Sequence, residues 1–245
     1  MNISPPFGYR EIVPLNRTKK VRLLAPGEVP EFARTLNSIP ISYTEFALVA
    51  REYPIVFTRS QADDSFAPVA VLGMAAGENL YNIGGSWVPE VYVPAYARRF
   101  PFCMARVTLD KVEQKNRLIC IEKAYQDDGA GEALFDAQGQ PLEKWTQIEK
   151  LLTEYETDLE RSRAMCGILA DYGLLEPFSM QAKLKEGGGA WHLTGMHRVA
   201  EGKIEGLNAS QLKNLVKKGI FGRVYAHLLS LDNFARLLDR RVARR

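Results

Sequence analysis

The sequence contains little cysteine, and this scarcity limits both its redox chemistry and its compartment. Cys103, Cys120 and Cys166 are odd in number, widely spaced and set among apolar residues. Such a pattern indicates buried free thiols rather than a disulfide framework. Because free thiols persist in a reducing environment, we expect a cytoplasmic protein.

Long hydrophobic runs and a strong charge of one sign are also missing. The longest apolar run covers about residues 66–76, well short of the roughly 20 residues that a spanning helix needs. The first residues show neither a basic region nor an apolar core, so we predict no signal peptide. The net charge of +3 is too weak to indicate nucleic acid or a membrane surface as a partner. These features predict a soluble globular chain of 245 residues.

Histidine is scarce as well, and the familiar catalytic signatures are missing. His192 and His197 are five residues apart in one predicted strand, so they point to opposite faces of the sheet. His227 lies far along the chain in a predicted helix. We find no P-loop, no dinucleotide-binding glycine motif, no CxxC, no HExxH and no GxSxG. The sequence therefore predicts no metal site and no cofactor.

The hydrophobic pattern divides the chain into an irregular start, a strand-rich stretch and a helix-rich stretch. Residues 1–40 are proline-rich, residues 41–140 are strand-rich and residues 141–245 are helix-rich. In the first 140 residues the pattern predicts strands at 19–24, 55–58, 68–74, 79–83, 103–109 and 117–121, and short helices at 42–52 and 94–100. The strands at 103–109 and 117–121 are expected to form a hairpin.

The clearest single element is a helix at 141–172. Its apolar side chains recur every three or four residues, a stripe that needs a partner helix or a sheet along its length. The stripe consists of Trp145, Ile148, Leu152, Tyr155, Leu159, Ser162, Cys166 and Leu169. This helix is also the expected contact surface for a homo-oligomer.

The remaining residues predict a hairpin and two further helices. Alternation places Trp191, Leu193 and Gly195 on one face of the return strand and Met196 on the other, with the turn at 187–189. Helices are expected at about 208–219, opened by an N-capping asparagine, and at about 221–240. Because strands dominate early and helices late, we predict an α+β fold with a mainly antiparallel sheet, in one domain over residues 1–245.

One segment concentrates aromatic rings, prolines and arginines. It holds Trp87, Tyr92, Tyr96, Arg98 and Arg99. The rings offer rigid contact area, and the guanidinium groups offer planar donors for a carboxylate or a phosphate. The alternative interpretation is that the rings belong to the core and the arginines are solvated or paired with acids.

The two arginines cannot serve the same role. Arg98 and Arg99 are adjacent in a predicted helix, so their side chains diverge by roughly 100°. We expect one to reach a concave ligand site and the other to pair with an acid such as Glu45 or Glu90. Glu45 is included among the candidate ligand-binding residues, and an unidentified ligand at this site should be anionic.

Several collinear motifs resemble the SapC family. They are found at residues 40–46, 51–57, 92–102, 134–139, 193–195 and 225–231. The resemblance spans about residue 10 to the C-terminus. It implies an association with surface-layer gene clusters and with flavin-dependent tryptophan-halogenase-like proteins as partners. It supplies no catalytic residues that can be transferred to this chain.

Three functional hypotheses remain open at this point. The first is a non-catalytic binding or accessory protein for a peptide, a partner protein or a small anionic ligand. The second is an enzyme of unrecognised type, whose available acids, bases and anion holders are Glu45, Tyr92, Arg98, Arg99, Glu122 and His227. The third is a component associated with the surface layer. The lack of catalytic signatures favours the first.

Overall fold

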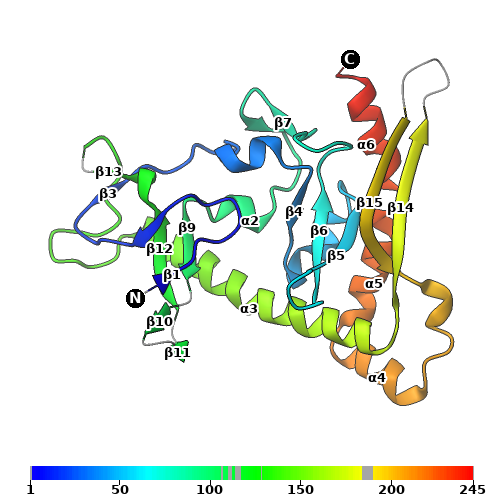
Figure 1. Cartoon of the computed structure of the whole chain (residues 1–245). Coiled ribbons are helices and arrows are strands. Elements are labelled where there is room, and N and C mark those ends of the chain that lie inside the picture. Colours follow the sequence, from blue (N-terminus) through cyan, green and yellow to red (C-terminus); the bar gives the residue numbers. More distant parts are fainter. Residues whose placement is uncertain are drawn as a thin grey trace.

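A five-stranded antiparallel sheet and one long helix organise the chain (Figure 1). The computed structural model describes residues 2–105, 107–109, 112–113, 117–127, 129–183 and 190–244. All strand pairs among these residues are antiparallel, and helices pack beside them, which confirms the α+β class. No helix within these ranges is long and apolar enough to cross a membrane.

The five-stranded sheet combines strands from both halves of the chain. Its order is β14-β15-β5-β6-β4. The bounds are Ser38–Pro40 for β4, Ile55–Arg59 for β5, Phe66–Val71 for β6, Leu175–Lys183 for β14 and Ala190–Val199 for β15. The predicted C-terminal hairpin therefore exists, and it extends the N-terminal sheet through the β15–β5 pair. Its predicted glycine turn at 187–189 lies outside the described residues.

The prediction of which side chains share a face of β15 is wrong beyond the middle of the strand. Phe178 pairs with Met196, whereas Met180 pairs with Leu193, so β15 carries one extra residue across this interval. Gly195 lies there with a φ of 75°, a conformation that glycine adopts without strain. Because a bulge of one residue reverses the alternation of faces, Met196 is buried in the same cluster that Trp191 and Leu193 pack against, and not on the opposite face.

A second, three-stranded sheet and three small strand groups lie at the other end of the molecule or along its margin (Figure 1). The predicted hairpin partners pair as expected, in the order β2-β12-β9. The bounds are Asn2–Ile3 (β1), Ile12–Pro14 (β2), Lys20–Val21 (β3), Asn82–Ile83 (β7), Ser86–Trp87 (β8), Phe102–Ala105 (β9), Val107–Leu109 (β10), Val112–Glu113 (β11), Leu118–Glu122 (β12) and Gln126–Asp127 (β13).

The strands predicted at 19–24 and 79–83 are only two residues long in the structure, as β3 and β7. At the second of these, Asn79 explains the difference. Its side-chain amide donates to the carbonyl of Ala33 at 2.7 Å and its side-chain oxygen accepts from the N–H of Tyr81 at 2.8 Å. Such local bonds compete with strand pairing, so the strand begins only after them.

The α-helices are Phe46–Val49 (α1), Ala95–Arg98 (α2), Glu143–Asp171 (α3), Ala209–Lys217 (α4), Ile220–Ser230 (α5) and Asn233–Val242 (α6), with 3-10 turns at Glu31–Thr35, Tyr43–Glu45, Lys123–Tyr125 and Glu201–Lys203. The predicted helix at 42–52 is thus a 3-10 turn followed by α1. Asn208 caps α4 with Gln211, as predicted.

The single helix expected at 221–240 is divided into α5 and α6. Two polar side chains at the break bond to other parts of the chain. The hydroxyl of Ser230 accepts from the N–H of Ile55 at 2.9 Å. The amide of Asn233 donates to the carbonyls of Ala50 and Tyr53 at 2.8 and 3.2 Å. These bonds fix both helix ends against the α1–β5 connection, a constraint that hydrophobic periodicity does not report.

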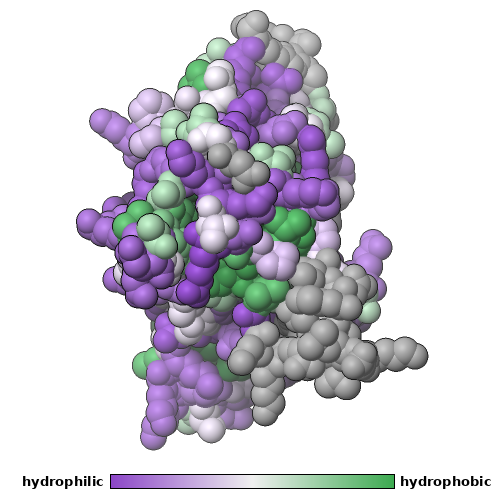
Figure 2. Space-filling model, turned by 90° about the vertical axis from the view of Figure 1, so that its left-hand side faces the viewer, coloured by the Kyte–Doolittle hydropathy of each residue, from purple (hydrophilic) through white to green (hydrophobic). Residues whose placement is uncertain are grey.

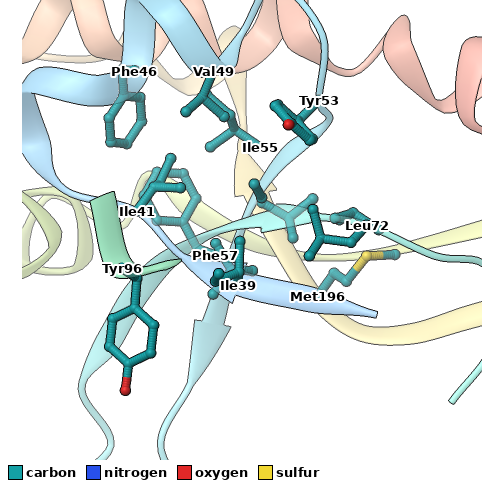
Figure 3. Packing of buried hydrophobic residues seen from close by; sticks show 14 of the residues in the cluster. Ile39, Ile41, Phe46, Val49, Tyr53, Ile55, Phe57, Leu72, Tyr96 and Met196 are labelled. Atoms are coloured by element: carbon teal, nitrogen blue, oxygen red, sulfur yellow. The ribbon is translucent and has the colours of Figure 1, made fainter. Parts of the chain in front are cut away.

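Helix α3 runs from the end of the molecule that holds β9 and β12 to the five-stranded sheet (Figure 1), and it contributes to two hydrophobic clusters. Its N-terminal half supplies Trp145 and Leu152 to the cluster around β9 and β12. Further along, Cys166 and Leu169 belong to the larger cluster under the five-stranded sheet. The apolar stripe is therefore mostly buried within the chain. Figure 3 shows the larger cluster, where side chains of β4, β5 and α1 point toward one another.

His227 fixes α5 to the five-stranded sheet. The imidazole is fully buried, its Nδ1 lies 2.8 Å from the carbonyl oxygen of Ile55, and its Nε2 accepts the N–H of Val199 at 3.0 Å. Only the neutral Nδ1–H form satisfies both contacts. Burial lowers the pKa of His227 from 6.5 to about 4.

Stability should fall in mild acid because of His227. The unfolded chain protonates this imidazole near pH 6.5, whereas the folded chain resists protonation until about pH 4. The stabilisation is complete above pH 6.5 and is lost as the pH falls to 4, by about 3 kcal/mol in total. Urea unfolding of His227→Gln should show a smaller decline than the native protein over this interval. An identical decline would contradict the assignment.

Candidate functional site

Glu45 joins the start of α1 to the start of α2. Its carboxylate is 3% exposed and accepts four hydrogen bonds. One oxygen accepts from the N–H and the hydroxyl of Ser42, both at 2.7 Å. The other accepts from the hydroxyl of Tyr92 at 3.0 Å and from the N–H of Ala95 at 2.6 Å. This network fixes the polypeptide that leads into α2.

Tyr92 and Arg98 extend the network from Glu45 toward solvent. The Arg98 guanidinium donates to the Tyr92 hydroxyl and to the carbonyl of Val93, both at 2.9 Å. Burial, reinforced by the negative charge of Glu45, raises the pKa of Tyr92 well above its ordinary value. The phenol therefore stays protonated and donates to Glu45 while it accepts from Arg98.

These three side chains border a cavity of about 420 Å³, which we call the Glu45 cavity. Its far wall is α3, which contributes Glu154, Asp158 and Arg161. Asp158 accepts a hydrogen bond from the hydroxyl of Thr44 and lies 3.3 Å from the guanidinium of Arg161. Three carboxylates and two guanidinium groups line this cavity, so it is weakly acidic and does not favour an anion.

Arg99 points away from Arg98 and is buried, with 4% of its surface exposed. Its guanidinium carbon lies 4.3 Å from the ring centre of Tyr96, 4.7 Å from that of Tyr155 and 5.7 Å from that of Tyr9. Glu156 of α3 is its acid partner, at 3.6 Å. The divergence of the two arginines agrees with the helical spacing, but the acid is neither Glu45 nor Glu90.

The polar atoms around Arg99 are incompletely satisfied. Its Nε and the hydroxyl of Tyr155 are buried and have no hydrogen-bond partner among the described residues. Burial raises the pKa of Tyr155 well above its ordinary value, although Arg99 opposes this effect. Burial alone would lower the pKa of Arg99. The neighbouring tyrosines raise this pKa by more than burial lowers it, so the guanidinium stays charged. Unsatisfied buried donors are costly, so these two groups need an explanation.

A cavity of about 540 Å³ adjoins this cluster, and we call it the Arg99 cavity. The polar residues of its described lining are Arg99, Arg117, Arg163, Glu156, Ser4, Tyr96 and Tyr155. Arg117 forms an ion pair with Glu156. Among the described lining residues, three guanidinium groups accompany one carboxylate, although Arg117 also lies 3.7 Å from the exposed Glu160, so the excess of positive charge comes from Arg99 and Arg163.

The structure divides the residues predicted from the sequence into three places. Tyr92, Arg98 and Glu45 border the Glu45 cavity, whereas Tyr96 and Arg99 border the Arg99 cavity. Tyr155 separates the two and lines both. Trp87 is core: it is 4% exposed and its indole N–H donates to the hydroxyl of Tyr53 at 2.7 Å. It is absent from the described linings of both cavities.

Several lining residues escaped the sequence-based prediction because they come from α3 or, like Arg117, from the segment just before β12. Tyr155 was assigned to the apolar stripe, and the buried acids Glu156 and Asp158 were not among the predicted site residues. The burial of Glu156 has no local signature in the sequence, since its partner Arg99 is 57 positions away. Across the described residues, no group of three or more histidine, cysteine, aspartate or glutamate side chains is placed to hold a metal ion.

The fold and the Glu45 and Arg99 cavities define an α+β protein with a buried arginine–tyrosine cluster. The family model named SapC matches residues 17–237, nearly the whole chain. The chain therefore belongs to the SapC family. No curated protein and no solved structure matches the chain.

Removing the Glu45 carboxylate should destabilise the fold. Glu45→Ala leaves four donors without an acceptor, which should lower the free energy of unfolding by about 3 kcal/mol. Glu154→Ala is the matched control, because Glu154 lines the same cavity but is exposed, and it should change stability by less than about 0.5 kcal/mol. Urea unfolding measures both. Equal losses for the two variants would refute the anchoring role.

Proposed function

We propose that this chain is a non-catalytic binding protein that holds a small anionic ligand in the Arg99 cavity. The observation that carries the proposal is the Arg99 side chain, which is buried and charged beside a cavity, and whose Nε donor has no hydrogen-bond partner within the described part of the chain. A carboxylate or a phosphate matches the planar fork of a guanidinium. The binding energy would come from satisfying donors that are already desolvated.

The charge balance of the cavity supports an anion over a neutral ligand. Glu156 is the single carboxylate of the described lining, and it is shared between Arg99 and Arg117. Arg163 adds a third positive charge from the solvent-exposed side. An incoming anion would therefore contact a site that is positively charged and partly water-excluded, where electrostatic attraction is stronger than at an open surface.

The tyrosines support a holding role rather than proton transfer. Burial raises the pKa values of Tyr96 and Tyr155 above the ordinary value for tyrosine. A general base works best when its pKa lies near the working pH, so these phenols are poor bases at neutral pH. The Tyr96 hydroxyl already donates to the carbonyl of Phe7 at 2.5 Å, so the Tyr155 hydroxyl is the phenol available to donate a hydrogen bond to a bound anion.

Titration with inorganic phosphate tests the proposal on the full chain. Calorimetry at constant ionic strength, balanced with chloride, should detect saturable binding to the native protein. Arg163→Gln should weaken the affinity about tenfold, because it removes a charge-assisted contact at the cavity. Arg161→Gln is the matched control: this exposed arginine lies two residues away on α3 and faces the Glu45 cavity. It should leave the affinity unchanged.

A conservative change at the buried arginine provides the second arm. Arg99→Lys keeps the charge but loses the planar fork, so phosphate binding should be weakened and not abolished. Circular dichroism and the urea midpoint establish that the variant is folded. Undetectable binding by the native protein, or equal losses for Arg161→Gln and Arg163→Gln, would refute the Arg99 cavity as an anion site.

A further inference from the structure

A third cavity has a different character, being lined mainly by apolar side chains. It has a volume of about 420 Å³ and lies between residues 23–28, α2, β9 and the N-terminal half of α3. Its walls include Leu24, Val93, Phe100, Ile148 and Leu151. We call it the Ile148 groove. Figure 2 views the end of the molecule that holds β3, β13 and the start of α3, and it shows hydrophobic atoms recessed among hydrophilic ones.

The groove exposes apolar side chains that the fold does not cover completely. Leu24, Val93, Ile148 and Leu151 are all partly exposed, although each packs against one of the two hydrophobic clusters. Each such side chain gains free energy when a ligand removes its remaining surface from water. A concave, mostly apolar cavity of this volume with a few polar groups at its margin is typical of small-molecule sites.

The walls of the groove are fixed before any ligand enters. The carbonyl of Gly27 accepts the N–H of Trp87 at 2.7 Å, and the N–H of Val29 donates to the carbonyl of Gly85 at 2.8 Å. These bonds fasten residues 23–28 to the β7–β8 hairpin. The opposite wall is the regular helix α3. A preformed groove of this kind does not spend binding energy on ordering its own walls.

The charges at the margin of the groove select the head group of a ligand. Three cationic side chains, Arg98, Arg99 and Lys144, line the groove together with one acid, Glu28. Lys144 is about half exposed and pairs with the equally exposed Glu132. Exposed ion pairs contribute little free energy, so this ammonium group can exchange its partner for a ligand carboxylate at low cost.

We propose that the Ile148 groove is a binding site for a straight-chain carboxylic acid, with the alkyl chain along Leu24, Ile148 and Leu151 and the carboxylate near Lys144. Apolar walls and a cationic margin together match an amphiphilic anion. This site is distinct from the Arg99 cavity. Arg99 borders both the groove and the Arg99 cavity. Arg117 and Arg163 line the Arg99 cavity and are absent from the described lining of the groove.

Chain length provides the first test. Octanoate, decanoate and dodecanoate are titrated into the full chain by calorimetry, each below the concentration at which it forms micelles. Every added methylene should lower the Kd about fourfold, which is roughly fifteenfold from one acid to the next. Decylamine, which has the same chain length as decanoate and the opposite charge, should bind at least tenfold more weakly than decanoate. A Kd that ignores chain length, or equal binding of the amine, would overturn the proposal.

Two matched pairs of variants locate the site. Lys144→Gln should raise the Kd for decanoate about fivefold, whereas Lys150→Gln, an exposed lysine on the same helix with its own acid partner, should leave it unchanged. Ile148→Gln should raise the Kd more than tenfold, whereas Val216→Gln, on the exposed surface of α4, should not. Equal effects within either pair would place the site elsewhere.

Two further measurements separate this site from its alternatives. Arg163→Gln should bind decanoate as the native protein does, so loss of the phosphate site and loss of the acid site are distinguishable. Sedimentation with phosphatidylglycerol vesicles tests the other source of an amphiphilic anion. Binding to vesicles without measurable binding of dissolved decanoate would overturn the proposal in favour of a membrane surface.

Discussion

The buried charge of Arg99 is the constraint on which the arrangement of this molecule depends. A guanidinium removed from water must be compensated, and here compensation comes from three tyrosine rings and from Glu156. Tyr9 belongs to the hydrophobic cluster around β9 and β12, whereas Tyr96 and Tyr155 belong to the larger one. Arg99 therefore lies where the two clusters meet, and its compensation requires residues from both.

Helix α3 supplies several of the residues that form the site around Arg99. It supplies Tyr155 and Glu156 to the arginine, and it continues into both clusters. Because neighbouring positions of a helix face different directions, Asp158 and Arg161 border the Glu45 cavity while Arg163 borders the Arg99 cavity. Arg98, the last residue of α2, and Arg99, which follows it, are separated in a similar way, since the first borders the Glu45 cavity and the second the Arg99 cavity. Two cavities of opposite charge balance therefore share one wall at Tyr155.

Local patterns in the sequence predicted the elements better than the site. The long helix, the C-terminal hairpin and the Asn208 cap follow from periodicity and capping chemistry, which act over a few residues. The bulge at Gly195 and the break between α5 and α6 depend on contacts distant in sequence, so they were missed. Glu45 and the two arginines were identified as candidates, but Glu156, the partner of Arg99 on α3, was not, because pairing across 57 positions leaves no local signal.

The most direct measurement of the central claim is the nuclear magnetic resonance signal of the Arg99 Nε–H group. In the free protein this donor has no hydrogen-bond partner among the described residues. On saturation with inorganic phosphate, its resonance should shift and its hydrogen should exchange more slowly with water, because a bound anion accepts it. The Nε–H signal of Arg161 should not move. A shift at Arg161 with an unchanged Arg99 signal would contradict the account.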